Sequence, residues 1–371
     1  MRLLLIFLFL ITSMSSQAAE STLNIDSARL NQSINVKIYT PKSYDLVNKT
    51  NYPVIYLLDG DAHANHTVTN SAFLNSTGVM PELIVVAIST VERFTYFTPT
   101  LDKNSGRDSG KADLYAQFLT SELMPEINKN YRVSGFNMVA GHSLGGLFCA
   151  YILQSQPDMF DAYYLFSPSL WWDNEVLAKH TDFKSRATLP FVYMSIANEQ
   201  GKQRTAYQNY QAKLSEVYPN AVFQEFPNED HMTTPLLSQI GAFRAQFADW
   251  LLSFDDVVSN PQRFITHYQT INAKFGTTAQ GQEWEIGQPV QHIVNELKDA
   301  NKALVASDVH LTMFPNSQWA YKSKADALAL KGDKSAAITH MEKAVSIAKE
   351  HNDKYLEMLQ ASLTSLKERQ F

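Results

Sequence analysis

The residues best suited to do chemistry in this chain form the pentapeptide Gly141-His142-Ser143-Leu144-Gly145. It lies between a strand-like run at 136–140 and a helix-like run at 147–154. In that setting a G-x-S-x-G sequence forms a nucleophile elbow, which holds the serine hydroxyl above the sheet. The turn is tight enough to need small flanking residues, and we expect both glycines to meet this need. The pattern predicts that Ser143 is a nucleophile for acyl transfer. The alternative is an ordinary strand-to-helix connection that contains these five letters by chance.

A serine hydroxyl becomes a good nucleophile only when a base takes its proton. On a sheet of this kind the order along the chain is nucleophile, acid, histidine. His231 follows the predicted strand at 221–226 and precedes a predicted helix at 233–252, so we expect it to be the base. Four other histidines stand at less suitable places, namely His63, His66, His142 and His180.

The base works best when a third group fixes its tautomer. This acid should follow the predicted strand at 190–196, where the sequence reads Ala197-Asn198-Glu199-Gln200. We therefore expect Glu199 to be the acid. Asp230 is one alternative, although consecutive side chains seldom face each other in an extended loop. The other alternative is a dyad of Ser143 and His231 without an acid.

The oxyanion formed in such a reaction is held by two backbone N–H groups. One is expected from Leu144, because the first N–H groups of a helix have no partner within it. The other should come from the loop after the predicted strand at 53–58, which reads Asp59-Gly60-Asp61. Gly60 permits a turn there, and the N–H of Asp61 is the expected donor. A plain Asp-Gly turn is the alternative.

Short apolar runs, typical of strands buried on both faces, alternate with helical stretches through much of the chain. The alternation predicts an α/β fold with a mostly parallel sheet, helices on both faces and two antiparallel edge strands within 22–39. After 254 only helix-favouring segments follow. The segment 319–349 is typical of one tetratricopeptide-type helix pair or of a generic helical hairpin. We expect a catalytic domain at 20–254 and a small all-helical region at 255–371.

The first 19 residues have the pattern of a secretory signal peptide, with Arg2, an apolar run at 3–11 and a small-x-small site at 16–18. The run is too short to span a bilayer, and no cysteine stands directly after it to carry a lipid. We expect a periplasmic or secreted protein that is not integral to the membrane. The single cysteine, Cys149, excludes an intrachain disulfide. A net charge of −6 without a long basic run argues against a nucleic-acid partner.

Three motifs resemble those of a group of esterases that includes esterase D-like proteins and enterobactin-type siderophore esterases. They are Tyr56-Leu57-Leu58-Asp59-Gly60-Asp61, Ala140-Gly141-His142-Ser143-Leu144-Gly145-Gly146-Leu147 and Phe166-Ser167-Pro168-Ser169-Leu170-Trp171-Trp172. The resemblance covers residues 27–252 and implies the α/β-hydrolase fold, Ser143 as nucleophile and His231 as base. It is strongest with periplasmic esterases that cleave trilactone siderophores. Some of these are thought to use a dyad, which leaves the role of Glu199 open.

The resemblance also implies residues that contact the substrate. In that group an arginine after the fourth strand helps to hold an anionic catecholate ligand, and Arg93 is the candidate by position. A solvated surface arginine is the alternative. Trp171 and Trp172 are candidate walls of the substrate pocket, although packing under the loop explains them equally well. The helical region departs from the smallest of these esterases, and capping the site, forming a homodimer and binding a protein partner are its candidate roles.

We therefore expect an exported serine hydrolase that cleaves carboxylic esters through an acyl-enzyme. Its substrate would be a small-molecule ester, with a ferric siderophore as one candidate, and it would need no metal or organic cofactor. A general carboxylesterase, a thioesterase or an acyltransferase fits the same residues. The alternative of another class is a helical-repeat binding or scaffold protein with a vestigial hydrolase domain.

Overall fold

The computed structural model describes residues 19–46, 49–103, 106–180, 183 and 188–368. The signal peptide expected at 1–19 lies outside the described residues except for Ala19, which begins the first strand. Among the described residues, none of the helices combines the length and apolar character needed to cross a bilayer.

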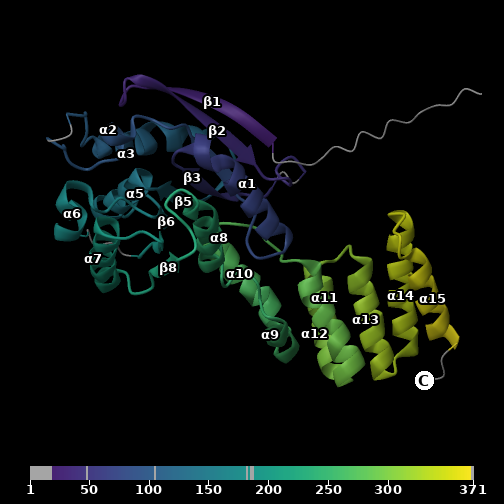
Figure 1. The fold of residues 1–371 in the computed structure, drawn as a ribbon. Helices are drawn as coiled ribbons and strands as arrows, with labels where there is room; N and C mark the ends of the chain where they lie inside the picture. The colour runs from purple at the N-terminus through teal and green to yellow at the C-terminus, as the bar shows by residue number, and fades with distance from the viewer. Residues whose placement is uncertain (1–18, 47–48, 104–105, 181–182, 184–187, 369–371) are drawn as a thin grey trace, which may run out of the picture.

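The central feature of the fold is one eight-stranded sheet (Figure 1). Its strands are β1 (Ala19–Ser27), β2 (Gln32–Thr40), β3 (Tyr52–Leu57), β4 (Ile84–Ile88), β5 (Val133–His142), β6 (Ala162–Phe166), β7 (Phe191–Ala197) and β8 (Val222–Phe226). They lie in the order β1-β2-β4-β3-β5-β6-β7-β8. β1 and β2 are antiparallel, as are β2 and β4, and every pairing from β4 to β8 is parallel. The predicted α/β class, with two antiparallel strands at one edge, is confirmed.

Helices cover both faces of this sheet, because successive strand side chains point to opposite faces. In β3, Val54 and Tyr56 join the core on one face, while Ile55 and Leu57 join the core on the other. The first face is covered by α3 (Ala112–Phe118), α4 (Met124–Asn130), α5 (Leu144–Ser155), α6 (Trp172–Lys179) and α7 (Lys202–Val217). The second face is covered by α1 (Gly60–Ser76) and α8 (Thr234–Gln246). A short helix, α2 (Arg93–Tyr96), follows β4, and a π-helical turn, η1 (Leu119–Leu123), separates α3 from α4.

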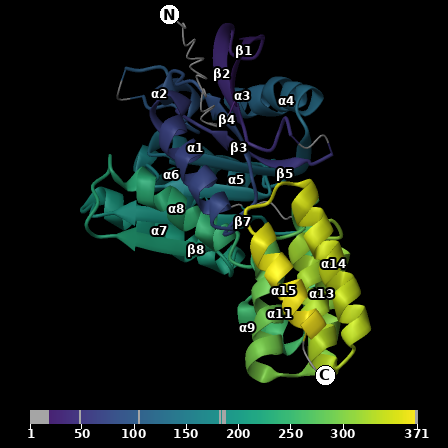
Figure 2. The same cartoon turned by 90° about the vertical axis from the view of Figure 1, so that its right-hand side faces the viewer.

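The C-terminal part is helical and projects to one side of the sheet (Figures 1 and 2). It contains α9 (Phe254–Ser259), α10 (Arg263–Phe275), α11 (Glu283–His292), the π-helical turn η2 (Ile293–Leu297), α12 (Ala300–Met313), α13 (Gln318–Lys331), α14 (Lys334–Glu350) and α15 (Leu356–Glu368). α13 and α14 form the expected helix pair, with the small residues Ala325 and Ala344 buried. Its assignment as a tetratricopeptide repeat stays a prediction.

Helix α10 joins this region to the sheet. Ile271 and Phe275 of α10 belong to the core of the sheet's second face. The ring of Phe275 lies 5.1 Å from that of Phe247 and 5.9 Å from that of Trp250, measured between centroids. These two residues follow α8, which ends at Gln246 and does not continue to 252 as the sequence predicts. The helix ends at Gln246, and the rings of Phe247 and Trp250 then pack with Phe275 in an aromatic cluster.

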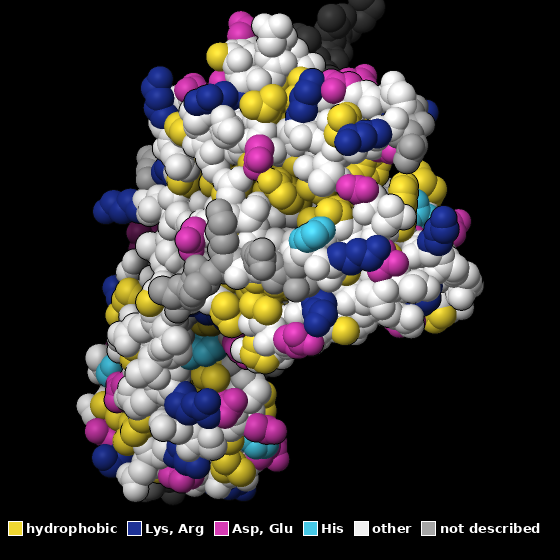
Figure 3. Space-filling view, turned by 90° about the vertical axis from the view of Figure 1, so that its left-hand side faces the viewer, with side chains coloured by type: hydrophobic (Ala, Val, Ile, Leu, Met, Phe, Trp, Pro, Cys, Tyr) yellow, Lys and Arg dark blue, Asp and Glu magenta, His cyan; other side chains and the backbone are white. Residues whose placement is uncertain are grey.

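Charged side chains of both signs are interspersed over the face shown in Figure 3. On the described part of this face, side chains of one sign do not gather in an extended patch.

The glycines in the turn between β5 and α5 differ in how much room they leave for a side chain. A Cβ on Gly141 would lie 2.3 Å from the carbonyl oxygen of Gly145, so only glycine fits there. A Cβ on Gly145 would have its nearest neighbour at 3.5 Å, an ordinary contact, whereas one on Gly146 would meet Pro168 at 3.0 Å. Of the two motif glycines that were expected to meet the need for small residues, Gly141 leaves no room for a Cβ, whereas Gly145 does. The following residue, Gly146, is the one that faces the loop after β6.

Gly141→Ala and Gly145→Ala form a matched pair that tests this difference. We expect Gly141→Ala to lower the free energy of unfolding by about 1–3 kcal/mol, since the backbone must shift to remove the clash. Gly145→Ala should be neutral or stabilising, because alanine favours a helix over glycine by up to about 1 kcal/mol. Urea denaturation measures both. Equal destabilisation by the two substitutions would contradict this account of the turn.

Candidate active site

Ser143 lies at the point where β5 ends and α5 begins. Its φ of 60° is rare for a residue with a side chain, and such strain is often found at functional sites. Its backbone N–H donates to the carbonyl of Phe166, at the end of the neighbouring strand β6, over 3.0 Å. The chain therefore folds the predicted elbow, with its serine fixed to the adjacent strand.

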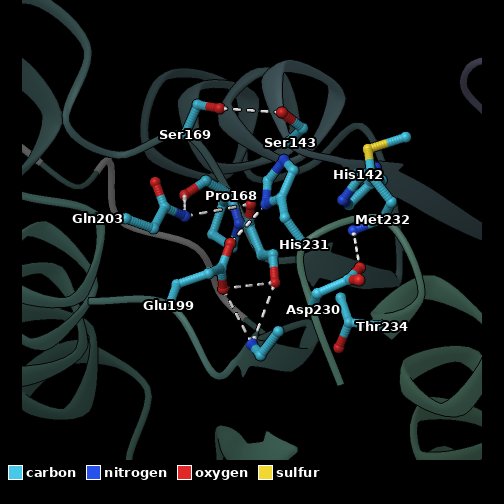
Figure 4. A network of polar contacts seen from close by, with 12 residues as sticks. His142, Ser143, Pro168, Ser169, Glu199, Gln203, Asp230, His231, Met232 and Thr234 are labelled. Carbon is cyan, nitrogen blue, oxygen red and sulfur yellow. Dashed lines mark hydrogen bonds and ion pairs between the residues drawn. The ribbon is translucent and has the colours of Figure 1, made fainter. Parts of the chain in front are cut away.

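Glu199 and His231 are in contact beside this elbow. Glu199 follows β7 and His231 follows β8, so the carboxyl ends of parallel strands bring them to the same edge of the sheet. The Nδ1 atom of His231 forms a hydrogen bond with Oε1 of Glu199. Figure 4 shows the imidazole of His231 between Ser143 and Glu199.

Asp230, the alternative acid, is used elsewhere. Its carboxylate accepts hydrogen bonds from the backbone N–H groups of Met232 (2.8 Å) and Thr233 (2.9 Å). These bonds stabilise the turn that leads into α8, and they hold the carboxylate away from the imidazole (Figure 4). The sequence left Glu199 and Asp230 as candidates for the acid. Among the described contacts, Glu199 is hydrogen-bonded to His231 and Asp230 is not.

The surroundings of Glu199 favour its ionised form. Burial opposes ionisation and is the largest single influence on this carboxyl group. Hydrogen bonds from His231, from the N–H of Ala197 at 2.9 Å and from the hydroxyl of Ser167 at 3.0 Å together outweigh it. The pKa of Glu199 is therefore held below its usual value. An ionised carboxylate at this place can fix the orientation of the imidazole.

The hydroxyl of Ser143 is hydrogen-bonded to another serine. Its Oγ lies 3.2 Å from Oγ of Ser169, in the loop between β6 and α6, and either hydroxyl can be the donor. Among the described contacts, the Ser143 hydroxyl is bonded to Ser169 and not to His231. Ser167 and Ser169 were noted in the sequence only as parts of a family motif, since nothing in their spacing shows which strand ends they reach.

In the loop after β3, Asp59 has a left-handed φ of 52°. A Cβ on Gly60 would lie 2.6 Å from the backbone of Ala87, so glycine is required there. Asp61 follows in the first turn of α1, and its carboxylate accepts hydrogen bonds from Ser89 Oγ (3.2 Å) and the Thr90 N–H (2.9 Å). The backbone N–H groups of Asp61 and Leu144 thus both belong to first turns of helices, where no intrahelical acceptor exists.

Arg93 links this loop to the elbow. Its Nε donates to Oδ2 of Asp59 and its Nη2 donates to the carbonyl of His142, each over 3.1 Å. The Arg93 side chain is 32% exposed, whereas the Asp59 side chain is buried. The role of Arg93 as a substrate ligand stays a prediction. Its two hydrogen bonds also make it a brace, because they connect the loop after β3 to the elbow.

The two tryptophans have different surroundings. Trp172 is 2% exposed, its Nε1 donates to Thr100 Oγ1 over 3.1 Å, and its ring packs against Phe94. Trp171 is 42% exposed. Trp172 therefore has the contacts of a packing residue, and Trp171 has surface available for a ligand.

Two histidines set aside in the sequence analysis lie behind the base. The ring centroid of His142 is 4.6 Å from that of His231 and 5.6 Å from that of His63. Burial lowers the pKa of His142 to about 3 and that of His63 to about 4. His142 and His63 therefore stay neutral at ordinary pH and add no charge beside His231. The elbow motif leaves the residue before the serine unspecified, so it gave no signal for this contact.

These two pKa values predict how stability depends on pH. The unfolded chain binds a proton on each histidine near pH 6.5, whereas the folded protein binds it only at much lower pH. The free energy of unfolding should therefore fall as pH drops below 6.5, by up to about 1.4 kcal/mol per pH unit for each histidine. Urea denaturation at several pH values in this range measures the effect. The free energy of unfolding should fall less steeply with decreasing pH in His63→Gln than in the natural protein. An unchanged slope would contradict the prediction.

Comparison with known proteins adds to this geometry. The family model described as Putative esterase matches residues 27–226, more than half of the chain. The ferri-bacillibactin esterase BesA of Bacillus subtilis (strain 168) is 30% identical over 215 residues, which cover 49% of this chain and 74% of BesA.

Two solved structures share the fold. The IroE-like serine hydrolase from Shewanella oneidensis has a TM-score of 0.62 and 24% identity, covering 79% of this chain and 99% of that chain. An uncharacterised protein from Capnocytophaga ochracea has a TM-score of 0.67 and 17% identity, covering 92% of this chain and 100% of that chain. The family match and the relative confirm the esterase resemblance seen in the three sequence motifs. The chain belongs to the Putative esterase family.

Proposed function

We propose that this protein is an exported serine esterase that hydrolyses carboxylic esters through an acyl-enzyme, and that siderophore esters are its substrate class. The observation that carries the proposal is the hydrogen bond between Glu199 and His231 beside the strained elbow of Ser143. A nucleophile, a base and an orienting acid from three strand ends form the arrangement that acyl transfer by serine needs.

The chemistry follows from these positions. Ser143 Oγ attacks the ester carbonyl carbon while its proton passes to Nε2 of His231. Glu199 accepts the Nδ1–H and thereby fixes the tautomer in which Nε2 is free to take that proton. The N–H groups of Leu144 and Asp61 stabilise the negative oxygen of the tetrahedral intermediate. His231 then gives the proton to the leaving alcohol, and water releases the acyl group by the same steps.

The substrate class rests on the relative and on two residues, Trp171 and Arg93, that can contact a ligand. BesA is named for a ferri-bacillibactin substrate, and it aligns over 74% of its length. The exposed ring of Trp171 offers an apolar contact for an aromatic ligand. Nη1 of Arg93 has no hydrogen-bond partner among the described residues, so it can still donate to an anion. Export rests on the leader-like sequence at 1–19.

Other serine enzymes use the same residues. A general carboxylesterase, a thioesterase and an acyltransferase differ from this proposal in the acyl group or in the acceptor that enters the second half-reaction. A scaffold role with an inactive hydrolase domain is disfavoured, because the chain keeps Ser143 at a strained elbow and the hydrogen bond between Glu199 and His231.

Glu199→Gln and Asp230→Asn are a matched pair that tests the acid. Each substitution replaces one carboxylate by an amide of nearly equal size. Glu199→Gln should lower kcat by about 10²–10⁴, since an amide can stabilise the wrong tautomer of His231. For Asp230→Asn, kcat should stay within about threefold of the natural value, because this substitution weakens only the hydrogen bonds of a turn.

Hydrolysis of a short-chain p-nitrophenyl ester and of a ferric trilactone siderophore measures both, with Ser143→Ala as the inactive reference. If Asp230→Asn loses more activity than Glu199→Gln, our choice of acid is wrong.

Arg93→Ala tests whether this residue acts as a brace. We expect kcat/KM to fall by about tenfold or more for a neutral p-nitrophenyl ester as well as for an anionic siderophore, with the larger fall for the siderophore, which also loses the donor at Nη1. The reason is that the loss of its bonds to Asp59 and His142 loosens the elbow for every substrate. Steady-state kinetics on both substrates gives the two factors. A loss confined to the siderophore would favour substrate binding and contradict the brace.

A further inference from the structure

Ser169 is a buried hydroxyl in direct contact with the reacting atom. The residue is 2% exposed, and its Oγ lies 3.2 Å from Oγ of Ser143. Among the described residues, Ser143 is the only hydrogen-bond partner of the Ser169 hydroxyl. Buried hydroxyl groups in folded proteins are almost always hydrogen-bonded, so the two serines satisfy each other.

The direction of this bond decides its effect. If Ser143 donates to Ser169, its proton points away from His231. If Ser169 donates to Ser143, the oxygen of Ser143 accepts and its own proton is free for Nε2 of His231. The second arrangement also places a donor at the oxygen on which negative charge grows as the proton leaves, and hydrogen bonds to charged acceptors are the stronger ones.

We propose that Ser169 is a further catalytic residue, whose hydroxyl donates to Oγ of Ser143 and thereby directs the Ser143 proton to His231. This inference rests on the proposed function. Ser169 keeps its own proton throughout: the Ser143 proton passes to His231 as the bond from Oγ to the carbonyl carbon forms. The bond from Ser169 strengthens while Oγ loses its proton and stabilises that stage of the reaction.

The loop that carries Ser169 is held firmly against the elbow. The N–H of Ser169 donates to the carbonyl of Ser143 over 2.9 Å, and a Cβ on Gly146 would meet Pro168 at 3.0 Å. Nε2 of Gln203 donates to the carbonyl of Pro168 over 3.0 Å. Ser167 is fully buried, with a φ of 39° that the surrounding contacts must stabilise. A donor fixed in this way needs little reorganisation during the reaction.

Ser169 and Ser167 act on different members of the site. The hydroxyl of Ser167 donates to Oε2 of Glu199 over 3.0 Å, whereas that of Ser169 contacts Ser143. Loss of Ser169 should therefore change the reactivity of the nucleophile itself. A small reagent that reacts with activated serines reports this reactivity without help from substrate binding, and a fluorophosphonate is suitable.

Ser169→Ala tests the inference, with Ser169→Cys as the conservative variant and Ser307→Ala as the control. Ser307 is a fully buried serine of α12 whose hydroxyl donates to the carbonyl of Leu304, remote in sequence from the site. Ser169→Ala should lower kcat for a p-nitrophenyl ester by about 10–100-fold, with KM within about twofold. The rate of fluorophosphonate labelling should fall by the same factor. Ser169→Cys should lie between, because a thiol is a weak donor, and Ser307→Ala should keep natural activity.

The inference is overturned if Ser169→Ala folds and reacts at the natural rate or faster, since the hydroxyl would then be inert or would hold the proton unproductively. If Ser169→Ala does not fold, Ser169→Cys decides: full activity and labelling contradict the role, and a partial loss of both supports it. Failure of the proposed function has a different result, in which Ser143→Ala matches the natural protein or the natural protein is neither labelled nor active.

Discussion

The arrangement of the site depends on the reversal of the chain at Ser143. Strand β5 turns into helix α5 within one residue, and the approach of Gly141 to the carbonyl of Gly145 is possible only without a side chain at Gly141. The turn places the first N–H groups of a helix and a serine hydroxyl at the same edge of the sheet. Because the N–H of Ser143 is bonded to the end of β6, the position of the nucleophile is fixed by the neighbouring strand.

From this point the site is connected through the loop after β6. Ser169 contacts the nucleophile, and Ser167 contacts the acid that holds His231. The loop after β3 is connected to the elbow on the other side through Arg93. Residues that follow all six parallel strands, β3 to β8, therefore supply a single network, which explains why a parallel sheet suits this chemistry. The helical region is joined to the same body through α10, and the fold shared with the Capnocytophaga ochracea protein includes nearly the whole chain.

Much of this could be predicted from local patterns. Continuous apolar runs indicated the parallel strands, since both faces of each strand are covered. The order nucleophile, acid, histidine pointed to Ser143, Glu199 and His231, and the contact of the last two fits that order. The contacts that sequence reasoning missed join residues far apart in the chain. Examples are Arg93 with Asp59 and Ser169 with Ser143, whose partners are fixed by the turns and not by spacing.

The ends of helices were harder to predict than the helices themselves, because they too depend on contacts with residues far away in the chain. α8 ends early because two aromatic residues after it pack against α10, a helix that is remote in sequence. A Cβ on Gly146 would crowd Pro168 at 3.0 Å, and the pentapeptide contains no information about that loop. His142 was set aside as a base, yet its ring contacts His231 because β5 and the loop after β8 meet at one edge.

The central claim is that Ser143 carries the acyl group during ester hydrolysis. The most direct test is to quench the protein in acid during turnover of an activated ester and to locate the acyl group by peptide mass spectrometry. The account predicts one acylated peptide, the one that contains Ser143, and no acylation of the Ser143→Ala variant. Acylation at another residue, or turnover by the natural protein without any acylated peptide, would contradict it.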